Sequence, residues 1–138
     1  MEPAARVLLA EDDTDLRALL AAELRRGGLD VVECANGLEL VEMLDRGDGD
    51  YDALVTDIRM PGVTGMEVLE GLNVFGKRCP VVLITAFGDE ETHATAKRMG
   101  AAVVLDKPFD ARDLVGEVVR LIDRRRRWSE AWKRSGEH

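Results

Sequence analysis

Residues 7–13 read VLLAEDD, an unbroken apolar run that ends on three carboxylates. Three further segments are built in the same way: residues 53–57 read ALVTD, residues 81–85 read VVLIT and residues 103–108 read VVLDKP. Strands that are buried on both faces of a parallel sheet are continuous apolar runs of this kind. Since the carboxyl ends of parallel strands lie along one edge, we expect the polar residues that end these runs to meet in one crevice.

The rest of the chain alternates strand patterns with helical patterns. We expect strands at 6–10, 30–34, 53–57, from Cys79-Pro80 to Thr85, and at 102–106. We expect helices at 14–26, after Asn36-Gly37, at 66–74, from Asp89 to Gly100, and from Asp110 past Arg120. Strand–helix repeats connect right-handedly and place helices on both faces of the sheet. The sequence therefore predicts an α/β fold with a parallel sheet.

The length of 138 residues fits one domain, and the charge is unevenly spread along it. Residues 120–138 hold seven basic and three acidic residues, a net charge of +4, whereas residues 1–119 hold 12 basic and 24 acidic residues, a net charge of -12. An acidic body argues against direct nucleic-acid binding by this domain. We therefore expect a domain at 1–123 and a basic helical extension or tail at 124–138.

No membrane association is expected from this sequence. No apolar run approaches the ~20 residues that cross a bilayer, and residues 1–6 lack the basic start and apolar stretch of a signal peptide. We expect a cytoplasmic protein.

The carboxylates of Glu11, Asp12 and Asp57 end two of the apolar runs and are expected to share the crevice. Clustered carboxylates repel one another unless a cation lies between them. Mg²⁺ suits such a site because it binds a few carboxylates and keeps positions for water and phosphate oxygens. The alternative is a solvated acidic helix start, since acids also favour helix N-termini.

Asp57 is the candidate nucleophile, because a carboxylate at a strand end can attack phosphorus and form an acyl phosphate. Such a transfer needs in-line positioning and neutralisation of the phosphoryl oxygens. Lys107 is placed to supply positive charge, Thr85 to donate a hydroxyl hydrogen bond, and the small Ala86 to leave the acceptor accessible.

Taken together, four segments resemble the receiver domain of two-component response regulators. They are residues 8–13 (LLAEDD), 56–65 (TDIRMPGVTG), 84–86 (ITA) and 107–109 (KPF), and the resemblance covers about Arg6 to Ile122. It implies a flavodoxin-like (CheY-like), doubly wound, five-stranded parallel sheet with strand order 2-1-3-4-5. It also implies that Asp57 accepts a phosphoryl group from a histidine of a sensor kinase. The chain would then be a phosphoprotein in phosphorelay signal transduction.

The resemblance further implies the roles of the site residues. The Mg²⁺ cofactor would be bound by Glu11, Asp12, Asp57 and the backbone carbonyl of Arg59. The phosphoryl group would be contacted by Thr85, Ala86 and Lys107. Asp13 is then a neighbour of the metal site and no ligand.

The resemblance has one departure, at the position three residues before the lysine. The family usually has an aromatic residue there that moves with the threonine, whereas this chain has Val104. We expect a switch through Thr85 and Val104 that acts on the surface of the fourth helix, fifth strand and fifth helix, which binds an effector or a second copy. Arg59 and Phe87 are expected to tune the lifetime of the phosphoryl group.

Three other functions remain as alternatives. An aspartyl-nucleophile phosphatase needs a second Asp two residues after the nucleophile, where this chain has Arg59. A flavin-binding protein needs a phosphate loop where Glu11-Asp12-Asp13 would repel phosphate. A phosphorylation-independent, receiver-like adaptor is left open by Val104. We expect no enzyme beyond self-directed phosphotransfer and autodephosphorylation.

The sequence also leaves open how the chain passes on a signal. The chain is expected to be a single-domain regulator or a fragment of a transcriptional regulator. Residues 124–127 are four arginines, and Trp128 and Trp132 lie four residues apart, on one helical face. This tail is interpreted as a solvated helix end, a partner or dimer contact, or a linker.

Overall fold

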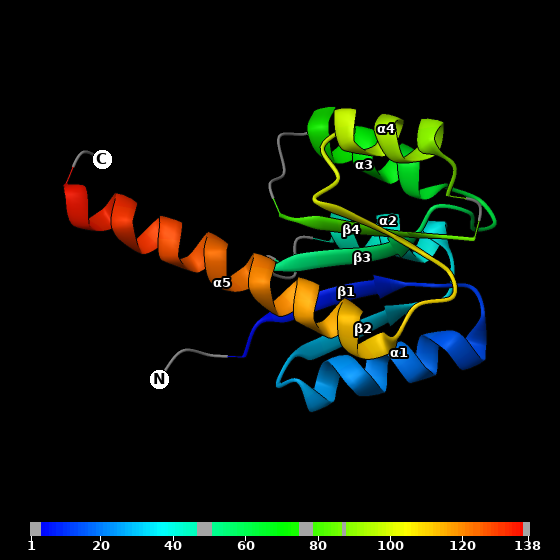
Figure 1. Ribbon diagram of the computed structural model, residues 1–138, viewed down its shortest axis with the longest axis horizontal. Helices are drawn as coiled ribbons and strands as arrows, with labels where there is room; N and C mark the ends of the chain where they lie inside the picture. Colours follow the sequence, from blue (N-terminus) through cyan, green and yellow to red (C-terminus); the bar gives the residue numbers. More distant parts are fainter. Residues whose placement is uncertain (1–3, 47–50, 75–78, 87, 137–138) are drawn as a thin grey trace.

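The computed structural model describes residues 4–46, 51–74, 79–86 and 88–136. Within these ranges, five strands alternate with five helices (Figure 1). The strands are β1 (Arg6–Ala10), β2 (Asp30–Cys34), β3 (Ala53–Asp57), β4 (Val81–Thr85) and β5 (Val103–Asp106). The helices are α1 (Thr14–Arg26), α2 (Gly37–Asp45), α3 (Gly65–Val74), α4 (Glu90–Arg98) and α5 (Ala111–Ser135). The predicted order of elements is confirmed.

The strands form one parallel sheet in the order β2-β1-β3-β4-β5, as the resemblance implied. In the central pairing, Ala10 of β1 lies opposite Thr56 of β3, so Asp57 ends β3 one residue beyond the end of β1. Asp57 in turn pairs with Ile84, and Thr85 with Asp106. The carboxyl ends of β1, β3, β4 and β5 therefore lie side by side at one edge.

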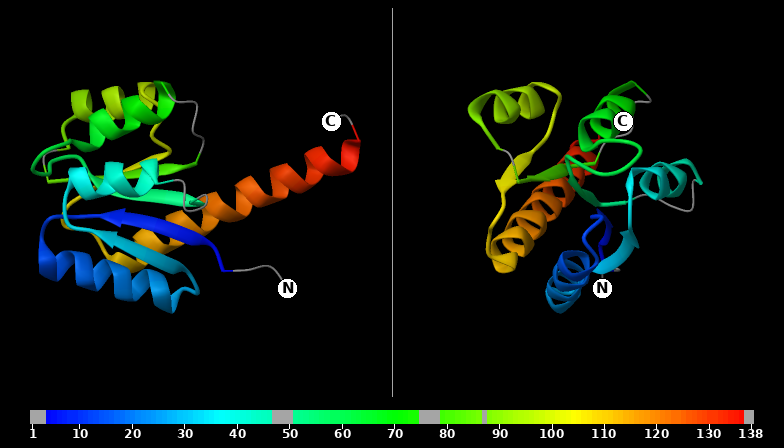
Figure 2. Two further views of the ribbon diagram at one scale, coloured as in Figure 1. Left: turned by 180° about the vertical axis from the view of Figure 1, so that it is seen from behind. Right: turned by 90° about the vertical axis from the view of Figure 1, so that its right-hand side faces the viewer.

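Helices cover both faces of the sheet (Figures 1 and 2). Side chains alternate along each strand, so Val7 and Leu9 of β1 pack in the cluster with α1 and α5, while Leu8 and Ala10 pack in the cluster with α2, α3 and α4. All four of these β1 residues are fully buried. Double burial of this kind, which β3 and β4 share, explains why these central strands are apolar runs, whereas the edge strands β2 and β5 are only partly buried.

Polar side chains at the helix starts fix where each helix begins. Four helices have an N-cap side chain that accepts a hydrogen bond from a backbone N–H of the first turn: Asp13, Asn36, Asp89 and Asp110. At α3, the Thr64 hydroxyl accepts from Glu67 N–H, and the Glu67 carboxylate accepts from Thr64 N–H, both at 3.1 Å. These caps satisfy backbone donors that have no partner within the helix.

The α5 helix continues well past the sheet. Its last buried residue is Ile122, and from there to Ser135 it leads away from the body as one straight helix (Figure 1). We call residues 4–122 the body and Asp123–Ser135 the α5 extension. The expected domain boundary at 123/124 stays a prediction.

Among the described helices, none combines the length and the apolar character that a membrane span requires.

Candidate functional site

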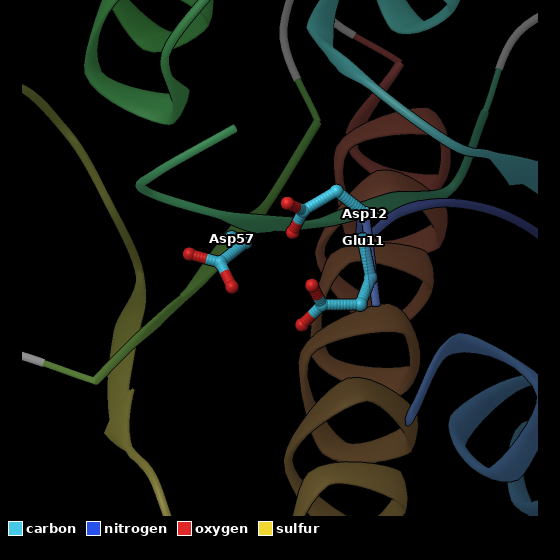
Figure 3. A group of neighbouring side chains, drawn as sticks. All are labelled: Glu11, Asp12 and Asp57. Carbon is cyan, nitrogen blue, oxygen red and sulfur yellow. The ribbon is translucent and has the colours of Figure 1, made fainter. Parts of the chain in front are cut away.

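Three carboxylates meet at the carboxyl edge of the sheet (Figure 3). Glu11 directly follows β1, and its backbone N–H donates to the Cys34 carbonyl at 3.1 Å, which ties it to the end of β2. Asp57 is the last residue of β3. Glu11 and Asp57 are buried, and Asp12 is exposed. One carboxylate oxygen of each residue lies within 4.8 Å of the others, so the predicted acidic cluster is present.

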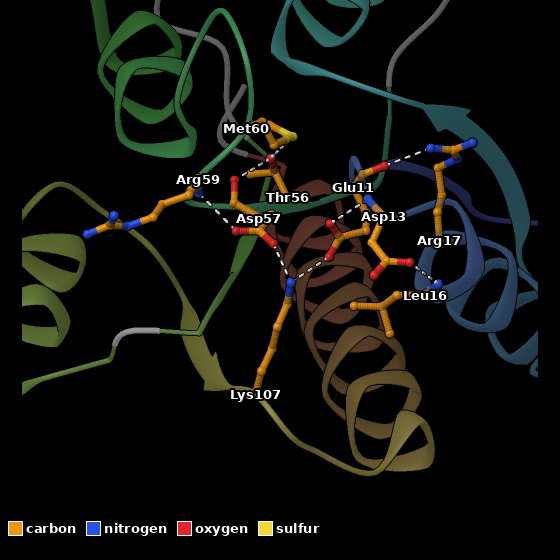
Figure 4. Close-up of polar contacts among 9 residues, drawn as sticks. All are labelled: Glu11, Asp13, Leu16, Arg17, Thr56, Asp57, Arg59, Met60 and Lys107. Carbon is orange, nitrogen blue, oxygen red and sulfur yellow. Dashed lines mark hydrogen bonds and ion pairs between the residues drawn. The ribbon is translucent and has the colours of Figure 1, made fainter.

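Lys107 projects into this cluster from the residue after β5 (Figure 4). Its Nζ lies 2.5 Å from Asp57 Oδ2 and 2.9 Å from Glu11 Oε1. The backbone N–H of Lys107 donates to the Thr85 carbonyl at 2.8 Å, so the lysine is anchored to the end of β4. One ammonium therefore offsets the charge of two buried carboxylates, which would otherwise repel each other.

Burial controls the protonation of Glu11. Desolvation raises the pKa of its carboxyl from 4.5 to about 7, although the Lys107 ammonium and the Asp13 N–H work in the opposite direction. Burial also disfavours the Lys107 ammonium, but the contacts with Asp57 and Glu11 outweigh this and hold the pKa of Lys107 above its ordinary value. Glu11 therefore has too little positive charge nearby to offset its burial, whereas Lys107 is held in its charged form.

The residues present fit a hard divalent cation. Glu11 Oε1 is buried and has no hydrogen-bond partner in the described part of the chain; its ion pair with Lys107 is its close contact. The donor set consists of carboxylate oxygens alone, which Mg²⁺ prefers over nitrogen or sulfur ligands. Glu11, Asp12 and Asp57 are the side chains that could hold such an ion.

The remaining predicted residues surround this centre. Thr85 ends β4 and is buried at the same edge, and Ala86 after it is exposed. Arg59 is exposed, and its backbone N–H donates to Asp57 Oδ1 at 2.9 Å. Val104 is half-buried in β5 and packs into the cluster with α2, α3 and α4. Phe87 lies outside the described residues.

Two further residues support the site and had not been predicted. Arg17 of α1 donates from Nη1 to the Glu11 carbonyl at 2.8 Å and forms an ion pair from Nε to Glu33 Oε1 at 3.5 Å. A Cβ at Gly65 would lie 2.7 Å from the Asp57 carbonyl oxygen, so only glycine lets α3 start this close to β3. Gly65 could have been found from the sequence, because it ends the 56–65 segment that carries the resemblance. Nothing in the sequence marks Arg17 as a residue of the site.

A sequence model of the response regulator receiver domain matches residues 7–119. The chain belongs to this family. Among curated relatives, it is 36% identical over 115 residues to the transcriptional regulatory protein FixJ of Azorhizobium caulinodans, covering 81% of this chain and 52% of FixJ. It is 33% identical over 117 residues to the response regulator receiver protein CpdR of Brucella abortus, covering 85% of this chain and 96% of CpdR.

The chain thus spans about half the length of FixJ, and likewise 52% of the Escherichia coli regulator CpxR. Solved receiver domains share its fold. The Francisella response regulator 1452 receiver domain superposes with a TM-score of 0.82 at 26% identity, covering 87% of this chain and 98% of that one. The receiver domain of a LuxO repressor protein from Vibrio parahaemolyticus reaches a TM-score of 0.86 over 94% of this chain and 98% of its own, a likeness of fold at 24% identity.

Proposed function

We propose that this receiver domain is a phosphorylation switch in which Asp57 accepts a phosphoryl group from a histidine of a sensor kinase. The observation that carries the proposal is the bridge from Lys107 to both Asp57 and Glu11, because it places a cation against one oxygen of Asp57 while the other oxygen accepts the Arg59 backbone N–H. Family membership supports the same role.

In the proposed transfer, an Asp57 oxygen forms the new bond to phosphorus while the bond from phosphorus to the donor imidazole nitrogen breaks. The imidazole keeps the electron pair of that bond and takes up a proton. Lys107 and the Arg59 N–H already hold the two Asp57 oxygens, so the nucleophile is oriented before the donor arrives. Thr85 and Lys107 are the residues that would contact the phosphoryl oxygens, beside the small Ala86.

We assign Glu11, Asp12, Asp57 and the Arg59 carbonyl to Mg²⁺. When bound, this ion neutralises the charge that develops on phosphoryl oxygens. Asp13 is assigned no ligand role, since its carboxylate caps α1 by accepting from Leu16 N–H at 3.0 Å.

The switch would act on the surface formed by α4, β5 and α5, whose partner is an effector or a second copy. Asp106 directly precedes Lys107, and its Oδ1 lies 2.9 Å from His93 Nε2 of α4. A shift of Lys107 toward a phosphoryl group would therefore pull on α4 through this contact. Such a route does not need an aromatic residue at Val104. Arg59 and Phe87 remain assigned to the phosphoryl lifetime.

The test is incubation with a small acyl-phosphate donor and Mg²⁺, followed by intact-mass measurement. We expect one phosphoryl adduct, none in Asp57→Asn, and none when a chelator removes Mg²⁺. Asp52→Asn is the matched control, because Asp52 accepts from Arg6 N–H at the opposite end of β1.

The alternatives predict other outcomes of the same measurement. Absence of an adduct in the folded, Mg²⁺-loaded protein would favour the phosphorylation-independent adaptor. Continuous hydrolysis of an added phosphomonoester would favour the phosphatase.

A further inference from the structure

The α5 extension carries both tryptophans of the chain on one face. Trp128 and Trp132 stack on each other, with ring centroids 5.4 Å apart and an interplanar angle of 14°. They are 66% and 45% exposed, far more than large aromatic side chains normally are. Trp128 also lines a cleft with Leu72 and Pro80, so this face points to the side of the molecule where α3 ends. An aromatic pair exposed in this way marks a contact surface.

The opposite face of the extension is charged and forms ion pairs within the helix. Arg127 pairs with Asp123 at 3.1 Å, and Arg134 with Glu130 at 4.0 Å. Residues 120–138 nevertheless keep a net charge of +4, against -12 for residues 1–119. The extension therefore suits an acidic surface that also offers apolar area for the two indoles.

The body offers such a surface between α2 and α3. A groove of about 330 Å³ is lined by four apolar side chains, two acids and Gly71, namely Val41, Leu44, Val68, Leu72, Asp45, Glu67 and Gly71. Val41 is 41% exposed, so this apolar surface is open to solvent.

Gly71 lies in this groove and is not required by the fold of the body. It sits in the middle of α3, where glycine is unfavourable relative to alanine, yet a Cβ there would meet no atom within 4 Å. Its φ is also not positive. The space that the missing side chain leaves open is therefore available to an incoming group.

We propose that the α2–α3 groove binds the Trp128/Trp132 face of the α5 extension of a second copy of this chain. Indoles would fill the apolar groove at Gly71, and arginines of the extension would face Asp45 and Glu67. If both copies exchange extensions, the contact closes with twofold symmetry. This interface is separate from the α4–β5–α5 surface of the proposed switch, and it does not depend on phosphorylation.

The donor is another molecule, because within one chain Trp128 lines a different cleft, with Asn73 and Pro80 at the end of α3, which does not include Val41, Leu44 or Gly71 of the groove. The helix is continuous from Ala111 to Ser135 and packs with α1 on one face of the sheet, whereas α2 and α3 cover the other. As a straight helix it leads away from the body (Figures 1 and 2). Charge complementarity between the basic extension and the acidic body then favours a second copy over self-pairing of two basic extensions, which would repel each other.

The test follows self-association of the full chain by sedimentation velocity and by tryptophan emission over a concentration series. Because both tryptophans lie in the extension, their emission reports on this face alone. We expect a concentration-dependent dimer, a blue shift of the emission that accompanies it, and weakening of both by added salt.

Variants on each side of the contact identify the groove. Trp128→Ala/Trp132→Ala and, separately, Gly71→Arg should each weaken the dimer by ~30-fold or more, as expected for central aromatic contacts. Gly71→Arg blocks the groove and adds a like charge, while its Cβ fits without a clash. The matched control is Leu19→Ala, which removes an exposed apolar side chain from α1.

Mixing the two variants gives the decisive result. One keeps an intact groove and the other an intact extension, so the mixture should recover a heterodimer that neither variant forms alone, with a blue shift of the Gly71→Arg tryptophans. A dimer that Gly71→Arg leaves unchanged would show that the extensions pair with each other, and a chain that stays monomeric throughout the series would show that no such contact exists. Either result overturns the proposal.

Discussion

Lys107 controls the balance of charge among the buried acids. Its ammonium lies within 2.9 Å of an oxygen of both Glu11 and Asp57, and both carboxylates are almost fully buried. A buried carboxylate that loses its cation is costly, because water can no longer compensate for the missing partner. The lysine and a divalent ion should therefore substitute for each other in stabilising this edge of the sheet.

Lys107→Met is expected to lower the free energy of unfolding by about 1–3 kcal/mol in the presence of a chelator, since two acids lose their cation. Saturating MgCl₂ should recover most of this loss. Urea denaturation with and without Mg²⁺ measures both. Lys97→Met on the exposed face of α4 is the control and should change stability by less than about 0.5 kcal/mol. Equal losses in the two variants would contradict the role given to Lys107.

Glu11 makes metal-free stability depend on pH. Its pKa is about 7 in the folded chain and 4.5 as the ordinary value, so the folded state keeps a proton that the unfolded state releases. The unfolding free energy should therefore be highest below pH 4.5 as far as this group is concerned, and should fall as the pH rises to about 7. We expect about 1–3 kcal/mol over this window.

Denaturation at a series of pH values in chelator measures this slope, and Glu11→Gln should remove its contribution. Because a metal binds only the deprotonated carboxylate, Mg²⁺ affinity should rise with pH across the same range. An affinity that is constant from pH 5.5 to 8 would argue against Glu11 as a ligand.

At the scale of the elements, adjacent acids have different tasks. Asp12 belongs to the carboxylate cluster, whereas Asp13 caps α1. Gly65 allows the start of α3 to pack directly on the carbonyl of Asp57. The helix ends thus set the position of the site as much as the strands do.

Asp13→Ala should reduce the unfolding free energy by about 1 kcal/mol, because α1 loses the hydrogen bond to Leu16 N–H, and it should still form the phosphoryl adduct. Asp12→Ala should do the reverse, with nearly unchanged stability and weaker Mg²⁺ binding. Thermal denaturation of the two variants measures their stability, and intact-mass measurement shows whether each forms the phosphoryl adduct. Loss of the adduct in Asp13→Ala would make Asp13 part of the metal site.

Gly65→Ala should destabilise the fold by about 1–3 kcal/mol and slow formation of the adduct, because the added Cβ meets backbone atoms at 2.7 Å that cannot rotate away. Gly71→Ala in the same helix is the matched control. Its Cβ meets nothing, so it should raise stability by about 0.5–1 kcal/mol through helix propensity and leave the adduct unchanged. Denaturation curves of the two variants separate the cost of the steric contact at residue 65 from the gain in helix propensity.

At the scale of the whole molecule, the body and the α5 extension should be energetically separable. No residue beyond Ile122 belongs to either described core cluster. A chain that ends after Arg127 should therefore unfold within about 0.5–1 kcal/mol of the full chain and keep the phosphoryl adduct, while losing the concentration-dependent dimer. Sedimentation velocity and urea denaturation measure both properties. A large loss of stability in the shortened monomer would show that the extension belongs to the core.

The pattern of apolar runs and polar ends determined the parallel α/β sheet, the order of its elements and the acids, lysine and threonine at its carboxyl edge. It could do so because double burial makes the central strands β1, β3 and β4 continuous apolar runs, and because parallel strands share one edge. Contacts between segments that are farther apart could not be predicted from it: the ion pair from Arg17 to Glu33, the link from His93 to Asp106, and the open groove at Gly71. These depend on how helices pack across the sheet, which fixes distances between side chains that no local pattern records.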